Sequence, residues 1–414
     1  MVKRKKSYVL FYDEAFHDRK LTEKKEKGEL NIENNELSDN FISVALGFNT
    51  HQSEQYLQNY LKFERNTKKT LGLPEEKEFK GTIVNKKNFK YGLSSFNKDA
   101  LKIYSEYFDL FNEEVIIQLS SLNKFELIII SILQEIHLNE FVNNQNFMYS
   151  IVKFLNTYKN KNLISILFDT ETTTEQAINV IINLLSEVSN FIKGVQRKKI
   201  EEHALQNIKL ILENSYFKIQ TATKYTWDYS RSIDGICLLL DELKIKETSV
   251  TLTIDREDNT VIEAQKRDFK KVISADSAEF PCVRFADILC NFIGRMLKSI
   301  DDEYLEDWDS EETKRNIEKK RILSEQWFKL TEEEFDLYKK IAKIFHKRKD
   351  IYWTVQTGIY AGHTSVFFSL IYYIGLSFNS YNDYKEICLE THRENFNTMS
   401  VQREFQLFEP VQNY

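Results

Sequence analysis

A single carboxylate within a strongly apolar segment constrains the fold of this chain more than any other feature. Asp287 lies in residues 283–293, where Phe285, Ile288 and Leu289 follow the i, i+3, i+4 spacing of a buried helical stripe. Burying a carboxylate is costly unless a cation or a metal ion pairs with it. The sequence therefore predicts that the fold brings a charged partner to Asp287.

Two other apolar runs end in acidic residues. Residues 8–12 are predicted to form a strand that leads into Asp13 and Glu14, and residues 250–254 a strand that leads into Asp255. Acids carried by two strand ends and one helix can form a divalent-metal site for phosphodiester chemistry, because Mg²⁺ prefers carboxylate oxygens. This pattern indicates a metal-dependent nuclease. The predicted ligands of Mg²⁺ or Mn²⁺ are Asp13, Asp255 and Asp287, with Glu14 or Glu78 completing the site.

The composition predicts a globular protein with many long helices. Of 414 residues, 42% are hydrophobic and 13% aromatic, which is ample for a core, and there are only 3 Pro and 11 Gly. The cysteines show no CxxC spacing and no nearby His pair, which excludes the zinc-finger and disulfide-scaffold classes; they are Cys237, Cys282, Cys290 and Cys388. Such thiols are typical of a cytoplasmic protein, which is the expected location.

Charge and hydropathy limit how this chain can bind nucleic acid and whether it can enter a membrane. The formal net charge is −6, so nucleic acid has to bind local basic patches and not the surface as a whole. The basic N-terminus is not followed by the apolar stretch of a signal peptide. The most hydrophobic window, Ser365 to Phe378, is too short and too rich in Ser and Tyr to span a bilayer. It is expected to be a buried helix, with a partner or dimer surface as the alternative.

The order of predicted elements indicates an α/β protein. Strands are predicted at residues 7–12, 41–48, 78–84, 115–119 and 249–255, and residues 163–169 are a further apolar run that ends in acid. Helices are predicted at about residues 52–69, 97–111, 125–160, 174–192, 199–213, 232–243 and 282–298. Early strands followed by a later strand and a closing helix follow the order of the RNase H-like fold, which collects acids at central strand ends and on a terminal helix.

Two regions are expected along the chain. Residues 1–300 are predicted to form an RNase H-like domain with a mixed sheet and a large helical insertion at about 125–245. Residues 301–414 are predicted to form a helical C-terminal extension, which begins with an acidic surface linker at 301–312. A protein partner or a second copy of the chain could bind through this extension.

A series of short motifs resembles a known family. The motifs, between about residues 7 and 297, are Phe11-Tyr12-Asp13-Glu14-Ala15, Glu78-Phe79-Lys80-Gly81, Thr253-Ile254-Asp255, Asp276-Ser277 and Arg284-Phe285-Ala286-Asp287. In order and spacing they resemble the RNase H-like proteins catalogued as domain-of-unknown-function family 3800. Two positions depart from the family pattern, because Ala15 stands where Ser is usual and Arg284 stands where Gln is usual.

The resemblance implies a nuclease that uses Mg²⁺ or Mn²⁺ and binds nucleic acid, with a role in phage defence or mobile-element biology. It does not separate DNA from RNA, or endonuclease from exonuclease action. The alternative, from another class, is a non-catalytic nucleic-acid-binding or scaffolding subunit that keeps the fold. Acids clustered around one cavity favour the enzyme, and acids spread over separate surfaces favour the subunit.

Glu78 and Lys80 allow more than one interpretation. In a strand over residues 78–84 both side chains lie on one face. Restriction-endonuclease-like nucleases carry a similar Glu-x-Lys, in which Lys orients the attacking water. In the favoured mechanism Lys80 stabilises developing charge. The alternative is a solvated ion pair on an edge strand, since such pairs are common.

Several further residues are candidates for the site. Asp169 and Glu171 follow the Asp-x-Glu order of proofreading-type 3′–5′ exonucleases, but the chain offers only His346 and Asp350 as the required His–Asp pair, at a spacing that does not fit. Asp169 is therefore an additional candidate ligand or part of a helix N-cap region. The predicted phosphate contacts are Lys266, Arg267, Lys270 and Lys271, with Arg284 either reaching a phosphate or pairing with Asp287. Asp276 is a further candidate, or a loop or helix cap.

Overall fold

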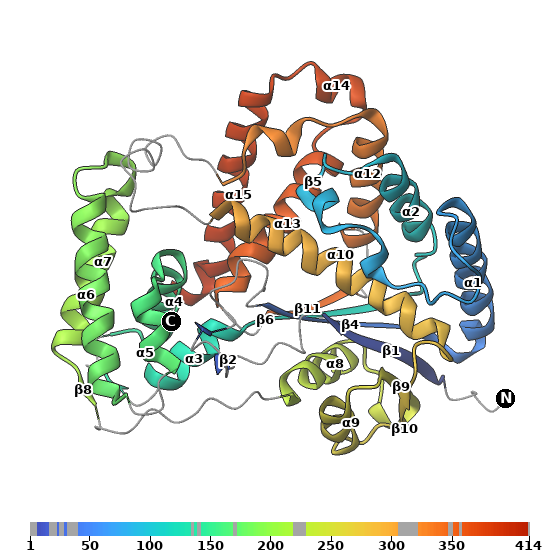
Figure 1. Cartoon of the computed structure of the whole chain (residues 1–414), viewed down its shortest axis with the longest axis horizontal. Helices are drawn as coiled ribbons and strands as arrows, with labels where there is room; N and C mark the ends of the chain where they lie inside the picture. The colour runs from blue at the N-terminus through green and yellow to red at the C-terminus, as the bar shows by residue number, and fades with distance from the viewer. Residues whose placement is uncertain are drawn as a thin grey trace.

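The protein is a mixed α/β protein built on one six-stranded sheet. Figure 1 shows the computed structural model. The structure describes residues 6–15, 23–24, 29–30, 40–133, 136–138, 142–168, 172–217, 229–304, 322–346, 351–355 and 358–412. In order across the sheet, the strands are β10 (Lys271–Ala275), β9 (Val250–Asp255), β1 (Tyr8–Ala15), β4 (Asn40–Asn49), β6 (Ile116–Asn123) and β11 (Ile351–Val355).

The strand directions bring three strand ends to one edge. β1 pairs with β4 in antiparallel fashion, and β4 pairs with β6 in the same way. On its other side β1 is parallel to β9, which is in turn parallel to β10. The carboxyl ends of β1, β9 and β10 therefore meet at a single edge of the sheet.

The two faces of β1 belong to different layers. Leu10 and Tyr12 pack beneath α8 (Ser230–Glu242) and α9 (Asp258–Gln265), whereas Phe11 and Ala15 pack in the core beneath the long α10 (Pro281–Tyr304). Figure 1 shows α8 and α9 on one side of the sheet and α10 on the other. Because strand side chains alternate, Asp13 faces α10 and Glu14 faces α8 and α9.

The other elements of the sheet-bearing part agree with most of the predicted boundaries. The predicted strands at 7–12, 41–48, 115–119 and 249–255 are confirmed as β1, β4, β6 and β9. The helices and short strands not yet named are β2 (Glu23–Lys24), β3 (Glu29–Leu30), α1 (Ser53–Thr70), β5 (Lys90–Leu93) and α2 (Lys98–Phe108). α1 and α2 lie close to their predicted ranges.

The strand predicted at residues 78–84 is wrong. This segment is irregular and contains a short 3-10 turn, Gly81–Ile83. Its backbone pairs with side chains of α10 and not with a neighbouring strand, since Gly81 N–H donates to Asp287 and the Val84 carbonyl accepts from Arg295. The alternating pattern of apolar residues here reflects packing across a helix.

A helical lobe with its own core follows β6, on the left of Figure 1. Its helices are α3 (Lys124–Leu133), α4 (Asn144–Tyr158), α5 (Lys161–Phe168), α6 (Thr174–Ile192) and α7 (Lys199–Glu213), with the short strands β7 (Ile136–His137) and β8 (Tyr216–Phe217). α3 to α7 lie within the predicted insertion at about 125–245, whereas α8, which is also within those bounds, packs on the sheet. Of the apolar run at 163–169, residues 163–168 lie in α5, since a short apolar run fits a buried helix as well as a strand.

The C-terminal region shares the core of the sheet and is not a separate layer. It contains β11 and the helices α12 (Glu332–His346), α13 (Gly358–Leu376), α14 (Tyr381–Lys385) and α15 (Leu389–Gln412). Side chains of α10, α12 and α13 form one continuous hydrophobic cluster, which corrects the expected division at residue 300. Of the predicted linker at 301–312, residues 301–304 complete α10 and the remainder lies outside the described residues.

The apolar window from Ser365 to Phe378 is confirmed as a buried helix. Phe367, Leu370 and Ile374 of α13 are fully buried against the chain's own core. No helix within the described ranges is long and apolar enough to cross a membrane.

Gly375 tests the close packing of α13 on α12. A Cβ at this position would lie 2.4 Å from Ala342 Cβ and 2.8 Å from the Tyr338 carbonyl oxygen. We expect Gly375→Ala to lower the free energy of unfolding by about 1–3 kcal/mol, because neither helix backbone can give way cheaply. The neighbouring Leu376 is 41% exposed, and Leu376→Ala should change stability by less than about 1 kcal/mol. Urea denaturation measures both, and equal effects would contradict the packing.

Candidate functional site

Asp13 and Asp255 lie side by side at one edge of the sheet. Tyr12 of β1 is in register with Ile254 of β9, so the next residues on the two parallel strands are the two aspartates. Both face α10, since Tyr12 and Ile254 face the opposite layer. Asp13 is only 8% exposed, and Asp255 is partly exposed. The structure thus brings together the two acids that sequence placed at strand ends.

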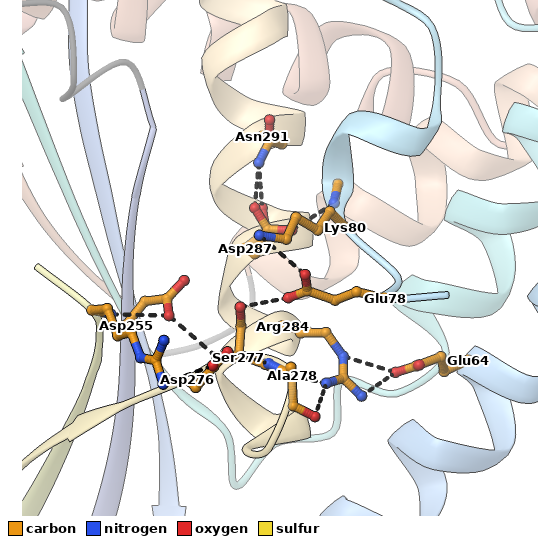
Figure 2. Close-up of polar contacts among 12 residues, drawn as sticks. Glu64, Glu78, Lys80, Asp255, Asp276, Ser277, Ala278, Arg284, Asp287 and Asn291 are labelled. Atoms are coloured by element: carbon orange, nitrogen blue, oxygen red, sulfur yellow. Dashed lines mark hydrogen bonds and ion pairs between the residues drawn. The ribbon is translucent and has the colours of Figure 1, made fainter. Parts of the chain in front are cut away.

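Asp287 reaches the same place from α10. Its Oδ2 accepts a 2.5 Å hydrogen bond from Gly81 N–H, and its Oδ1 accepts one of 2.5 Å from Asn291 Nδ2. Figure 2 shows Asn291 one helical turn above Asp287. Asp287 also lies within hydrogen-bonding reach of Asp13. The helix and the first strand therefore share one group of acids.

Two of these acids, Asp13 and Asp287, have raised pKa values. Burial, the charge of Asp287 and the charge of Asp255 together hold the pKa of Asp13 well above its usual range. Burial also raises the pKa of Asp287, although the Gly81 N–H and the Lys80 ammonium act in the opposite direction. Three neighbouring carboxylates with little solvent repel one another, so the group favours a bound proton or a cation.

Glu78, Lys80 and Ser277 border the aspartates, as Figure 2 shows. Lys80 Nζ lies 3.2 Å from Glu78 Oε2, and Ser277 Oγ donates a 2.5 Å hydrogen bond to Glu78 Oε1. Ser277 N–H donates to Asp255 Oδ1 at 3.3 Å. Burial lowers the pKa of Lys80, but Glu78, and more weakly Asp255 and Asp287, outweigh it and raise this pKa. A lysine cation therefore lies against the acids, half exposed to solvent.

The donor atoms suit a hard divalent cation. Carboxylate oxygens are the ligands that Mg²⁺ and Mn²⁺ prefer, and Asp13, Asp255 and Asp287 supply them from three elements. In the part of the chain that the structure describes, no group of three or more His, Cys, Asp and Glu side chains is arranged closely enough to hold a metal ion. The chemistry of the donors fits such an ion, while their arrangement is more open than a closed ligand shell.

Glu14 does not belong with these acids, which corrects its assignment as a metal ligand. Its side chain is buried on the other face of the sheet, with 6% of the residue exposed. Tyr12 Oη donates a 2.8 Å hydrogen bond to Glu14 Oε1, and Thr260 Oγ1 donates one of 2.6 Å. Adjacent residues of a strand point to opposite faces, so Asp13 and Glu14 cannot both face α10.

Arg284 neither contacts a phosphate-accessible surface nor pairs with Asp287, so both predicted roles are wrong. It is 5% exposed, and its Nη2 lies 2.8 Å from Glu64 Oε2 of α1. Its Nη1 donates to the carbonyl oxygens of Ser277 and Ala278. The guanidinium therefore fixes the loop before α10 to α1, as Figure 2 shows.

The basic residues predicted to contact phosphate lie away from the acids. Lys271 begins β10 and is in register with Thr251, whereas Ala275 is in register with Asp255. Four residues of strand, about 13 Å, separate the two levels. Lys266 and Arg267 follow α9, close in the chain to the start of β10, and Lys270 immediately precedes β10. Lys266 pairs with Glu263, and Arg267 pairs with Asp234. This corrects the predicted phosphate contacts, since parallel strands put the start of β10 and the end of β9 at opposite edges.

Two further candidates have other outcomes. Asp276 follows β10, where it pairs with Arg256 at 2.9 Å and accepts a 2.9 Å hydrogen bond from Ala278 N–H. It therefore shapes the turn before α10 at the border of the site. Asp169 lies outside the described residues.

Sequence reasoning missed Asn291 and the role of Gly81. Asn291 is four residues after Asp287, so both side chains lie on one face of α10, and that spacing was the available signal. Gly81 was noted only as the end of a motif. Its contact with Asp287 joins residues 206 positions apart, which no local pattern reveals.

Comparisons with known proteins add no relative. No protein-family model matches this chain, and no curated protein or solved structure matches it either.

Burial and charge repulsion at Asp13 predict that removing its charge stabilises the protein. The folded protein binds a proton at Asp13 more tightly than the unfolded chain does, so this group's contribution to stability is full below the usual aspartate pKa and is lost as pH rises through the raised pKa. Without divalent cations, we expect Asp13→Asn to raise the free energy of unfolding at pH 7 by about 1–2 kcal/mol, and the gain to shrink towards pH 4.

Chemical denaturation across this pH range, in chelator, measures the effect. The exposed Asp241 of α8 provides the control, and Asp241→Asn should produce no gain of this kind. Loss of stability in Asp13→Asn at pH 7 would contradict the repulsion.

Proposed function

We propose that this protein is a metal-dependent nuclease with an RNase H-like core, which hydrolyses phosphodiester bonds of nucleic acid. The observation that carries the proposal is the meeting of Asp13, Asp255 and Asp287, from two parallel strand ends and one helix, with a raised pKa at Asp13. Carboxylates gathered in this way against their mutual repulsion are typical of functional sites.

The strand order supports the RNase H-like assignment. β1, β4 and β6 come first and are antiparallel, then β9 and β10 add in parallel beyond β1, and α10 follows and covers the sheet. An RNase H-like fold is expected to carry acids at central strand ends and on the closing helix. Asp13, Asp255 and Asp287 occupy those three positions.

The aspartates are the residues that would hold Mg²⁺ or Mn²⁺. A bound ion of this kind supplies an activated water and neutralises charge on the phosphate. Because the carboxylates repel one another and a nearby phosphate group, a divalent cation would reduce that repulsion.

Lys80 lies against the acids and contributes positive charge to the site. Glu78 pairs with Lys80, and Ser277 holds Glu78 through its hydroxyl and contacts Asp255 through its N–H. This chain of contacts keeps the ammonium next to Asp287. In that position Lys80 can stabilise negative charge that develops on a phosphate oxygen.

A cleavage assay tests the proposal. Single- and double-stranded DNA and RNA are incubated with the protein in Mg²⁺, Mn²⁺ or chelator. We expect cleavage only with a divalent cation, and a loss of about a hundredfold or more in Asp13→Asn and in Asp287→Asn, since the ion supplies several kcal/mol. Lys80→Met should lose less.

The control is Lys266→Met, at the far edge of the sheet, which should cleave normally. Cleavage that persists in chelator and in Asp13→Asn would rule out the mechanism. Tight nucleic-acid binding without cleavage under any of these conditions would instead indicate the non-catalytic subunit.

A further inference from the structure

The carboxylate of Asp287 is held on both oxygens by neutral donors. Gly81 N–H binds Oδ2 and Asn291 Nδ2 binds Oδ1, each at 2.5 Å. An ionised carboxylate only accepts hydrogen bonds, so Asn291 has to present its NH₂ group. The same NH₂ group also donates to the Asp287 carbonyl oxygen at 3.1 Å, which fixes the amide against its own helix.

Gly81 leaves no room for a side chain at this contact. A Cβ would lie 2.6 Å from Asn291 Cβ and 3.0 Å from Asn291 Nδ2. The Gly81 backbone therefore rests directly on the asparagine, and both reach Asp287 only because this approach is so close. Figure 2 shows the segment that bears Glu78 and Lys80 running beside this part of α10.

Residues 78–84, here called the strap, are attached at one end to the turn before α10 and at the other end to α10 itself. Glu78 accepts from Ser277, just before the helix, and the Val84 carbonyl accepts from Arg295, two turns beyond Asp287. Arg295 also lies over the Phe89 ring, 5.4 Å from its centroid. The Gly81–Asn291 contact is therefore the midpoint of a fixed strap, and it sets the distance between Lys80 and Asp287.

The chemical nature of the donors matters. A lysine or arginine in place of Asn291 would add a second cation, besides Lys80, that competes with a divalent cation for Asp287. An amide and a backbone N–H orient the carboxylate and leave its negative charge available. Groups that orient ligands in this way typically change metal affinity or activity by about 10–100-fold when they are removed.

We propose that Asn291 is a positioning residue, which together with the Gly81 N–H aims the Asp287 carboxylate at Asp13 and Asp255 for binding a divalent cation. This inference rests on the proposed function, since it concerns the same site. It assigns a role to Asn291 that goes beyond the ligand set, and it explains why position 81 requires glycine.

The test measures Mn²⁺ binding to metal-free protein by isothermal titration calorimetry, together with thermal stability in chelator. We expect Asn291→Ala to weaken Mn²⁺ binding by about 10–100-fold, and Asn291→Gln, which keeps the donor, to recover much of the loss. Gly81→Ala should weaken binding in the same way, because its Cβ displaces Asn291. In cleavage assays, Asn291→Ala should lower kcat at fixed Mn²⁺ and leave KM for the oligonucleotide unchanged.

Two matched controls separate positioning from general damage. Asn59→Ala removes an exposed asparagine from α1, and Gly72→Ala strains a residue at φ 64° that has nothing within 4 Å of its added Cβ. Both should bind Mn²⁺ as the wild type does, even where Gly72→Ala lowers the melting temperature.

The outcomes distinguish this inference from the function on which it rests. If the wild type binds Mn²⁺ and Asn291→Ala binds it equally well, the inference is wrong and the proposed function stands. A fall in melting temperature of Asn291→Ala without any change in Mn²⁺ affinity would show a purely structural role and would also overturn it. A wild type that binds no Mn²⁺ would overturn the proposed function and the inference together.

Discussion

Electrostatic repulsion among three buried or half-buried aspartates is the constraint on which the rest of the site depends. Asp13, Asp255 and Asp287 come from separate elements, and burial together with the charges of the other two aspartates raises the pKa of Asp13. Three neighbouring groups act on these acids. The Gly81 N–H and the Asn291 amide orient the Asp287 carboxylate, and the Lys80 ammonium offsets part of the negative charge. A protein that only needed a stable edge for its sheet would place apolar side chains there.

α10 carries residues of two different charged groups, one a buried ion-pair network and the other the group of aspartates. Near its start, Arg284 pairs with Glu64, which also binds Lys68 at 2.7 Å, and the remaining guanidinium donor binds loop carbonyls. That network is buried, and each of its charged groups has a partner, so it anchors the helix to α1. One turn later, Asp287 faces the sheet edge with negative charge in excess. A helix held firmly at one turn can present a carboxylate rigidly at the next.

Much of this architecture was predictable where one segment carried its own signal. Apolar alternation located β1, β4, β6 and β9, and helical spacing located α6, α7 and the stripe around Asp287. The failures arose where two elements share a pattern. Residues 78–84 alternate like a strand but lie across a helix, and the apolar run of α5 fits a helix as well as a strand.

The sequence by itself determined which acids end β1 and β9 and which one interrupts an apolar helix, because local periodicity encodes those positions. Only the tertiary structure decided which acids meet. Because strand side chains alternate, Glu14 lies on the opposite face of the sheet from Asp13. Because β9 and β10 are parallel, Lys271 lies at the opposite end of the strands from Asp255. Arg284 is buried and pairs with Glu64. The contact of Gly81 with Asp287 spans 206 residues. Distances through space follow from packing, and no local pattern in the chain contains them.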